Sequence, residues 1–140
     1  MEKGYKVSDC HVIQLKGTSN RSGNMITAEN LVDIPFEIKR VFYLYDIPGD
    51  ASRGGHAHKE LEQLIVAVSG SFDMTLDDGV SKKVVHLNRS NQALHLRPGI
   101  WKEMSNFSSG AICLSLASDK YDEDDYIRDY ETFILKYGNN

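Results

Sequence analysis

The sequence SFDMTLDDGVSKKVVHL occupies residues 71–87 and decides which fold we expect for the whole chain. Polar and apolar residues alternate through residues 71–76, which is typical of a strand with one buried face. The turn-forming sequence Asp-Asp-Gly follows at residues 77–79, and Asp-Gly between two strand-like runs is a strong hairpin signal. Residues 80–87 then supply the partner strand. This stretch therefore predicts a β-hairpin.

Other short runs with the composition of strands lie on both sides of the hairpin. They occupy residues 41–45, 64–68, 94–96 and 111–117. Several short strands separated by turn sequences indicate a β-sandwich or barrel rather than alternating strands and helices. Only residues 124–135 have the pattern of a short helix with an apolar side. We therefore predict a single all-β domain over residues 1–140, with a short C-terminal helix.

Composition and charge exclude several classes of protein. The 140 residues carry 16 Lys and Arg against 20 Asp and Glu, whereas nucleic-acid-binding domains concentrate basic residues. No apolar run approaches the roughly 20 residues that span a bilayer, and the first residues lack the apolar stretch of a secretory signal. The two cysteines are too isolated for a disulfide framework. We therefore expect a cytoplasmic protein without nucleic-acid or membrane partners.

The most informative stretch for function is RGGHAH, at residues 53–58. Side chains two residues apart on a strand project to the same face, so His56 and His58 point together, either into the barrel or out of it. Gly54 and Gly55 allow the strand to bend, or to approach a ligand closely, just before the pair. The alternative is two solvated histidines on an edge strand. The preceding Arg-Gly-Gly and the apolar strand that follows favour a functional site.

The residues around this pair resemble the two signatures of the cupin superfamily. The sequence HAH at residues 56–58, followed by Glu62 and Gly70, is similar to the first signature. The run at residues 98–106 is similar to the second. The resemblance implies a cupin-type jelly-roll β-sandwich or barrel, with the histidines pointing inward, where many members hold a metal ion.

Lys102 occupies the position of the second signature where the last metal-binding histidine is expected. An ammonium group has no acceptor to offer a cation, and it repels a cation in a low-dielectric site. We therefore expect no metal and no other cofactor. Imidazole alone can carry acid–base chemistry, since its pKa of about 6.5 suits proton transfer at neutral pH. A metal-dependent cupin enzyme that uses His56, His58 and Glu62 is the alternative.

Longer runs narrow the resemblance to one group of cupins. The runs at residues 40–48, 53–59, 98–101 and 121–130 are similar to the WxcM-like sugar 3,4-ketoisomerases. The resemblance implies a cofactor-independent enzyme that converts dTDP-4-keto-6-deoxyglucose to a dTDP-3-keto-6-deoxyhexose, in deoxysugar biosynthesis for lipopolysaccharide or another surface glycan. It also implies a homodimer whose N-terminal strands can cross between subunits. A non-catalytic module that binds a nucleotide sugar is a further alternative.

By this resemblance, His56 and His58 carry over as the catalytic pair. One group must remove the C3 proton and another must move protons between two oxygens, and the sequence does not divide these tasks between the histidines. The enediolate intermediate needs a donor or a positive charge aimed at it. Either Arg53, next to the pair, or Tyr43, on a neighbouring strand, could supply it.

The diphosphate of the substrate needs basic partners, and arginine binds phosphate oxygens in pairs. The candidates near the ends of predicted strands are Arg40, Arg53, Arg89 and Arg97. Lys102 could contact a sugar hydroxyl or the phosphate, and Trp101 could stack on the base or belong to the core. A solvated surface charge is the competing interpretation for both Arg89 and Lys102.

We assign structural roles to the remaining polar residues. His86 and His95 have no histidine partner at matching spacing. Glu62, in the absence of a metal, is expected to orient a histidine through a hydrogen bond. The acidic run at residues 122–125 is expected to supply negative charge at the start of the C-terminal helix, where the helix dipole favours it.

Overall fold

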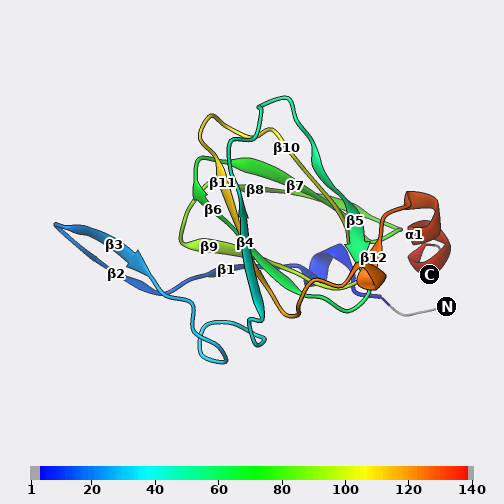
Figure 1. Ribbon diagram of the computed structural model, residues 1–140, viewed down its shortest axis with the longest axis horizontal. Coiled ribbons are helices and arrows are strands. Elements are labelled where there is room, and N and C mark those ends of the chain that lie inside the picture. The colour runs from blue at the N-terminus through cyan, green and yellow to red at the C-terminus, as the bar shows by residue number, and fades with distance from the viewer. Residues whose placement is uncertain (1–3, 139–140) are drawn as a thin grey trace.

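The computed structural model describes residues 4–138 and folds them into two antiparallel β-sheets that face each other (Figure 1). The first sheet contains, in spatial order, β1 (Val12–Gln14), β9 (Gln92–Leu96), β6 (Gln63–Ser69), β11 (Ile112–Ala117) and β4 (Arg40–Leu44). The second contains β12 (Tyr126–Ile127), β5 (Arg53–His58), β10 (Trp101–Ser105), β7 (Phe72–Asp77) and β8 (Lys82–Leu87). A separate ribbon pairs β2 (Gly17–Asn20) with β3 (Gly23–Ile26), and α1 (Tyr130–Tyr137) follows the last strand. The predicted all-β class with a short C-terminal helix is confirmed.

The hairpin predicted from residues 71–87 forms the edge of the second sheet. β7 pairs antiparallel with β8 over its whole length. Phe72, Met74 and Leu76 are fully buried, while the side chains between them face outward. Asp78 closes the turn, because its Oδ1 accepts the backbone N–H of Val80 at 2.9 Å. The alternation of the sequence therefore sets which face of this sheet points inward.

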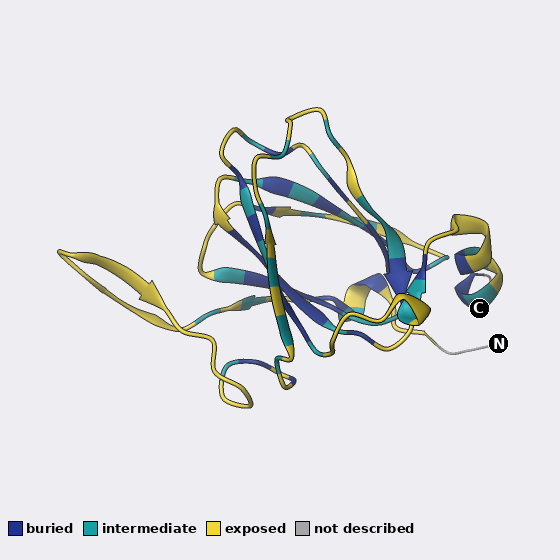
Figure 2. Cartoon of the chain, viewed as in Figure 1, coloured by how far each residue is buried: buried dark blue, intermediate teal, exposed yellow. Residues whose placement is uncertain are grey.

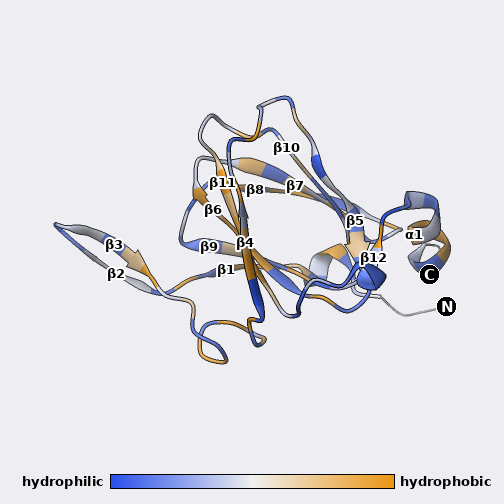
Figure 3. Cartoon of the chain, in the orientation of Figure 1, coloured by the Kyte–Doolittle hydropathy of each residue, from blue (hydrophilic) through white to orange (hydrophobic). Residues whose placement is uncertain are grey.

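Buried apolar residues form three groups. Figure 2 marks the buried residues along the chain and Figure 3 marks its hydropathy. The largest group fills the space between the sheets and includes Phe72, Leu94 and Met104. A second group covers the outer face of the first sheet, where Phe36 packs against Leu64, Val66, Ala93 and Leu116. The third lies beneath α1 and contains Ala57, Trp101, Ile127, Phe133 and Tyr137. Apolar burial thus fixes both sheets and leaves the β2–β3 ribbon exposed.

Two glycines with positive φ produce a bulge in β5. The φ angle is 98° at Gly54 and 61° at Gly55, in the left-handed region that glycine adopts without a steric penalty. The register between β5 and β10 shifts at this point, as it does where one strand carries an extra residue. The Gly-Gly sequence is therefore needed for the local path of the strand.

The bulge decides which β5 side chains point between the sheets. On one side of the shift, Lys102 of β10 lies opposite His56, and on the other side Met104 lies opposite Arg53. Directly opposed residues of antiparallel strands project to the same face, and Met104 belongs to the inner core. Arg53 and His56 are three residues apart, a spacing that would put them on opposite faces of a regular strand. The bulge turns Arg53 toward the inner face, on the same side as the histidines.

The C-terminal helix α1 (Tyr130–Tyr137) begins later than the predicted range 124–135. Asp129 caps it, because its side chain accepts a backbone N–H of the first turn at 3.0 Å. The predicted role of residues 122–125 at the start of this helix is therefore wrong, since they precede the cap. Asp125 instead binds the turn after β5. Within residues 4–138, no helix has the length and the hydropathy needed to cross a membrane.

We predict that Gly54→Ala destabilises the fold more than Gly55→Ala. A Cβ atom on Gly54 would lie 3.0 Å from the carbonyl oxygen of Lys102, whereas nothing lies within 4 Å at Gly55. Both variants carry the cost of a positive φ, about 1–2 kcal/mol, so Gly54→Ala should lose about 1–3 kcal/mol beyond its control. Urea unfolding followed by circular dichroism measures both free energies. Equal losses would contradict close packing of the bulge on β10.

Candidate active site

His56 and His58 lie side by side on the inner face of β5. Their ring centroids are 5.0 Å apart in an edge-to-face arrangement. His58 is buried and His56 is half-buried. The ring of Tyr126, from β12, packs against both, with centroids 4.9 Å from His56 and 4.3 Å from His58. The structure therefore brings together the two predicted catalytic residues, and adds a tyrosine that the sequence pattern did not single out.

Burial keeps both imidazoles neutral. Desolvation, followed by the positive charge of Lys102, lowers the pKa of His56 to about 4 and that of His58 to about 2. Nδ1 of His56 lies 2.9 Å from the carbonyl oxygen of Gly54. A carbonyl oxygen only accepts, so Nδ1 carries the hydrogen and Nε2 presents a lone pair. None of the hydrogen bonds found within residues 4–138 uses Nε2 of His56.

Lys102 is a buried cation beside the histidines. Its side chain is 3% exposed, and Nζ donates a hydrogen bond to Oε1 of Gln63 at 2.9 Å. Burial lowers the pKa of Lys102 to about 8, so the ammonium form still predominates at neutral pH. The interpretation of Lys102 as a solvated surface charge is therefore wrong, because β10 directs the side chain between the two sheets.

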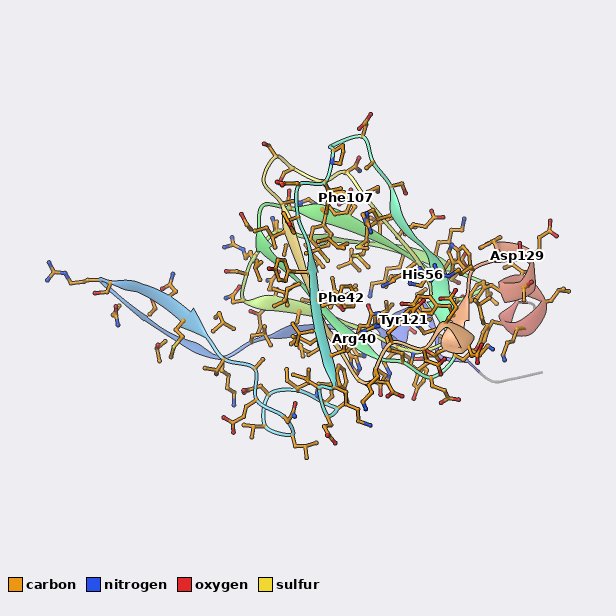
Figure 4. All side chains as sticks on the ribbon, in the orientation of Figure 1. Arg40, Phe42, His56, Phe107, Tyr121 and Asp129 are labelled. Carbon is orange, nitrogen blue, oxygen red and sulfur yellow. The ribbon has the colours of Figure 1, made fainter. Side chains whose placement is uncertain are left out.

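Arg40 and Arg53 approach the histidines from two different strands. The guanidinium of Arg40 lies over the ring of Tyr121, 5.6 Å from its centroid, and its Nε is buried without a hydrogen-bond partner among the described residues. Figure 4 shows Arg40, Tyr121 and His56 in the same region of the molecule. The positive charge of Arg40 contributes to lowering the pKa of His58. Arg53 begins β5 on the inner face and is exposed.

Tyr43 and Trp101 point away from this cluster. Tyr43 lies on the outer face of β4 and is 60% exposed, because inward and outward side chains alternate along the strand. Trp101 is buried beneath α1, where its ring centroid lies 5.6 Å from that of Phe133. Within this chain, neither residue reaches the histidines. Trp101 belongs to the core, which was one of its two interpretations.

Arg89 and Arg97 also lie elsewhere. Arg89 is exposed in the loop after β8, where it lines a pocket of about 660 Å³ together with residues of the β2–β3 ribbon. Arg97 lies over the ring of Tyr5, 4.0 Å from the centroid. Its Nε is 3.4 Å from Glu62 and forms an ion pair without hydrogen-bond geometry. The contacts of these two arginines do not include the histidine pair.

Glu62, the metal ligand of the metal-dependent alternative, forms the hydrogen bond to a histidine that was expected in the absence of a metal, but its partner is His95. Its Oε1 lies 2.8 Å from Nε2 of His95, while the next residue, Gln63, points toward the pair. Divalent cations prefer imidazole and carboxylate ligands, but Nε2 of His58 faces the amide of Gln63, with the Lys102 ammonium behind it. The carboxylate beside the pair, that of Asp125, is bound to Nδ1 of His58 and to backbone N–H groups. Within the described part of the chain, no three His, Cys, Asp or Glu residues are arranged to hold an ion. The donor set therefore does not fit the metal-dependent alternative.

The sequence pattern did not identify Gln63 or Asp125 as parts of the site. Asp125 Oδ2 lies 3.1 Å from Nδ1 of His58, and because this histidine is neutral the contact is a hydrogen bond rather than an ion pair. Gln63 could have been suspected as a polar residue directly before the apolar run 64–68. Asp125 lies in the run 121–130 that carries the resemblance, but its acidic neighbours suggested a helix start.

Known proteins are similar to this chain over most of its length. The family described as FdtA: WxcM-like, C-terminal matches residues 8–137. The chain is 43% identical over 122 residues to a TDP-4-oxo-6-deoxy-alpha-D-glucose-3,4-oxoisomerase of Aneurinibacillus thermoaerophilus. The aligned residues cover 87% of this chain and 88% of that protein.

Solved structures give the same result. A 3,4-ketoisomerase from Helicobacter canadensis has a TM-score of 0.89 and 46% identity, over 91% of this chain and 96% of that one. The 3,4-ketoisomerase QdtA from Thermoanaerobacterium thermosaccharolyticum, as a His-to-Asn variant in complex with TDP-4-keto-6-deoxyglucose, has a TM-score of 0.92 and 35% identity, over 94% and 96% of the two chains. These relatives confirm the predicted cupin-type fold and the sugar-nucleotide 3,4-ketoisomerase class. The chain belongs to the FdtA family, of the WxcM-like, C-terminal type.

Proposed function

We propose that the protein is a cofactor-independent 3,4-ketoisomerase that converts dTDP-4-keto-6-deoxyglucose to a dTDP-3-keto-6-deoxyhexose in deoxysugar biosynthesis. Two neutral imidazoles, 5.0 Å apart beside the buried ammonium of Lys102, are the main support for this proposal. The complex of the Thermoanaerobacterium thermosaccharolyticum relative with TDP-4-keto-6-deoxyglucose supports the choice of substrate.

The reaction moves a carbonyl group to the neighbouring carbon without net oxidation. A base takes the C3 proton, and the C3–H electron pair forms the double bond of an enediolate while O4 becomes negative. The proton on O3 then passes to O4. A proton returned to C4 leaves a ketone at C3 and a hydroxyl at C4. One group must therefore serve carbon and another the two oxygens.

In this proposal His56 is the base at carbon and His58 moves protons between the oxygens. Nε2 of His56 has a free lone pair because Nδ1 donates to Gly54. His58 is buried and has a partner at each ring nitrogen. A resting pKa of about 4 makes His56 a weak base, so stabilisation of the enediolate must lower much of the barrier. The ammonium of Lys102 supplies a fixed positive charge for that purpose.

Arg40 and Arg53 are the proposed partners of the diphosphate. The buried Nε of Arg40 makes no hydrogen bond within residues 4–138, and buried polar groups are normally satisfied. A phosphate oxygen would satisfy it. Arg53 shares the inner face with the histidines and is exposed enough to meet a ligand from solvent. Of the two candidate donors to the enediolate, Arg53 and Tyr43, we favour Arg53, because Tyr43 faces outward.

We predict that His56→Asn and His58→Asn each lower kcat by about 10²–10⁴-fold, the usual contribution of a positioned acid or base. Wild-type protein incubated with dTDP-4-keto-6-deoxyglucose in deuterated water should form the 3-keto product and incorporate deuterium at carbon, followed by NMR. His86→Asn is the matched control, because His86 is 56% exposed and bonded to Asp73.

Other outcomes of the same experiment separate the alternatives. Tight nucleotide-sugar binding without product or exchange would favour a non-catalytic binding module. Loss of activity on dialysis against a chelator, restored by a divalent metal, would favour a metal-dependent enzyme. Full activity in both histidine variants would rule out the proposed mechanism.

The pH dependence of kcat/KM should depend on Lys102. Burial lowers its pKa from 10.5 to about 8, so the cation, and with it the activity, should be lost as the pH rises through about 8. Lys102→Met should lower kcat by about 10²–10³-fold, as removal of an oxyanion donor does, and should abolish this basic limb. Lys82→Met, at an exposed position of β8, should keep the wild-type kcat and the basic limb. A basic limb unchanged in Lys102→Met would contradict this role.

We also propose that the protein is a homodimer. Val41 and Tyr43 lie on the outer side of the edge strand β4, and Tyr45 directly follows it. Each is more than half exposed, and contiguous exposed apolar side chains often mark an interface. The β2–β3 ribbon extends away from the sheets (Figure 1) and is exposed along both strands. Its position would allow it to reach a second subunit, as the crossing of N-terminal strands requires.

Light scattering after size-exclusion chromatography should give twice the chain mass of 15.8 kDa. Tyr43→Glu combined with Tyr45→Glu should shift the protein to a monomer, because charges replace the apolar contact. Val84→Glu, at a position 63% exposed on β8 of the other sheet, should remain dimeric. A wild-type monomer at micromolar concentration would contradict the proposed assembly.

A further inference from the structure

Four side chains from different parts of the fold form one continuous hydrogen-bonded chain through His58. Lys102 Nζ donates to Gln63 Oε1 at 2.9 Å. An ammonium group can only donate, so the amide of Gln63 must present its oxygen to Lys102 and its nitrogen to the opposite side. That nitrogen, Nε2, lies 3.4 Å from Nε2 of His58. Since the amide nitrogen can only donate, Nε2 of His58 must be the acceptor.

The other side of the ring leads to the same protonation state. Nδ1 of His58 lies 3.1 Å from Oδ2 of Asp125, and a carboxylate only accepts. Nδ1 must therefore carry the hydrogen. The donor–acceptor rules at Gln63 and at Asp125 are independent of each other, yet both require the Nδ1–H tautomer.

Asp125 is itself held rigidly. Its Oδ1 accepts the backbone N–H of Glu60 at 2.8 Å, and Oδ2 accepts that of Leu61 at 3.3 Å. Its own carbonyl oxygen accepts the N–H of Lys59 at 2.9 Å. These hydrogen bonds fix the Asp125 carboxylate to the turn that follows β5, and so fix its position relative to His58.

We propose that Gln63 and Asp125 are positioning residues that hold His58 in the Nδ1–H tautomer, so that its Nε2 lone pair is directed toward the substrate. This inference rests on the proposed function. The contact of 3.4 Å with Gln63 lies beyond the usual range of about 2.7–3.2 Å for a nitrogen donor, so a sugar hydroxyl can replace it as donor. His56 is held in the same tautomer by Gly54. Both imidazoles then present Nε2 lone pairs.

Several charged or titratable groups face His58 and must be considered in any test that varies pH. They are Asp125 before β12, Tyr126 on β12, Arg128 after it, Lys102 on β10, His56 on β5 and Arg40 on β4. Gln63 is neutral, so Gln63→Glu introduces a single new charge into this set. The glutamate cannot donate to Nε2, and it favours a proton on that nitrogen.

Side-chain ¹⁵N NMR of the resting wild-type protein measures the tautomer directly. We expect His58 to show a protonated Nδ1 and an unprotonated Nε2 at pH 7. In Gln63→Glu, the pH at which the ¹⁵N signal of His58 Nε2 reports a bound proton should rise by at least one unit, because the new carboxylate favours that proton. A wild-type Nε2–H tautomer would overturn the inference, and so would an unchanged pH of protonation at His58 Nε2 in Gln63→Glu.

Asp125→Asn gives a second, separate test. We expect kcat to fall by about 100-fold, the lower end of the contribution of an acid–base group, with KM changed less than about threefold. The matched control is Asp124→Asn, because the carboxylate of the neighbouring residue Asp124 makes no contact with His58. This variant should keep the wild-type kcat and KM. Equal kinetics in the two variants would contradict the role of Asp125. If Asp125→Asn does not fold, as judged by circular dichroism, Gln63→Glu decides the inference alone.

The NMR measurement needs no substrate, so it separates this inference from the proposed function. The expected tautomer in a protein without isomerase activity would reject the function and leave the tautomer assignment intact. Isomerase activity with an Nε2–H tautomer would reject only the inference.

Discussion

The hydrogen bond from the Lys102 ammonium to Gln63, buried between the two sheets, is the contact on which the rest of the site depends. A charged amine taken out of water must donate to something, and Gln63 Oε1 is the acceptor 2.9 Å away. That bond fixes the amide of Gln63 and, through it, the ring of His58. The same positive charge lowers the pKa of both histidines. Burial and the charge of this one lysine thus keep both histidines neutral, and the lysine orients the amide of Gln63.

Two features of the backbone bring these groups together. The bulge at Gly54 and Gly55 shifts the register so that Arg53 and His56 face inward on the same strand. The segment before α1 then returns across β5, where β12 pairs with His58 and Ala57. This return places Asp125 behind His58 and Tyr126 over its ring. The site is therefore built on strand pairing, which holds side chains more firmly than loops do.

Local patterns in the sequence predicted the parts of this structure that depend on neighbouring residues. The alternation before Asp77-Asp78-Gly79 gave the hairpin, and the two-residue spacing gave the shared face of His56 and His58. Two other features depend on residues far apart in the sequence. One is which side chains face inward on either side of a bulge, and the other is the return of the C-terminal segment to pair with β5. For that reason the sequence did not show that Gln63, rather than Glu62, points to the pair, or that the candidate donor Tyr43 faces outward. Asp125, which lies 67 residues from His58 along the chain, was assigned to the start of a helix.

The electrostatic balance of the site indicates what kind of ligand completes it. Lys102 and Arg40 are cations held against two neutral imidazoles, and burial opposes adding a further positive charge, as the low pKa of His58 shows. The nearby carboxylates are already engaged, Asp125 by backbone N–H groups and Glu123 by Arg128 at 2.6 Å. Among residues 4–138, neither Lys102 nor Arg40 forms an ion pair with a carboxylate, so the site suits an anionic ligand. In the reaction that we propose, a nucleotide diphosphate supplies one anion on binding and an enediolate supplies another during turnover, so the same cations can serve affinity first and catalysis afterwards.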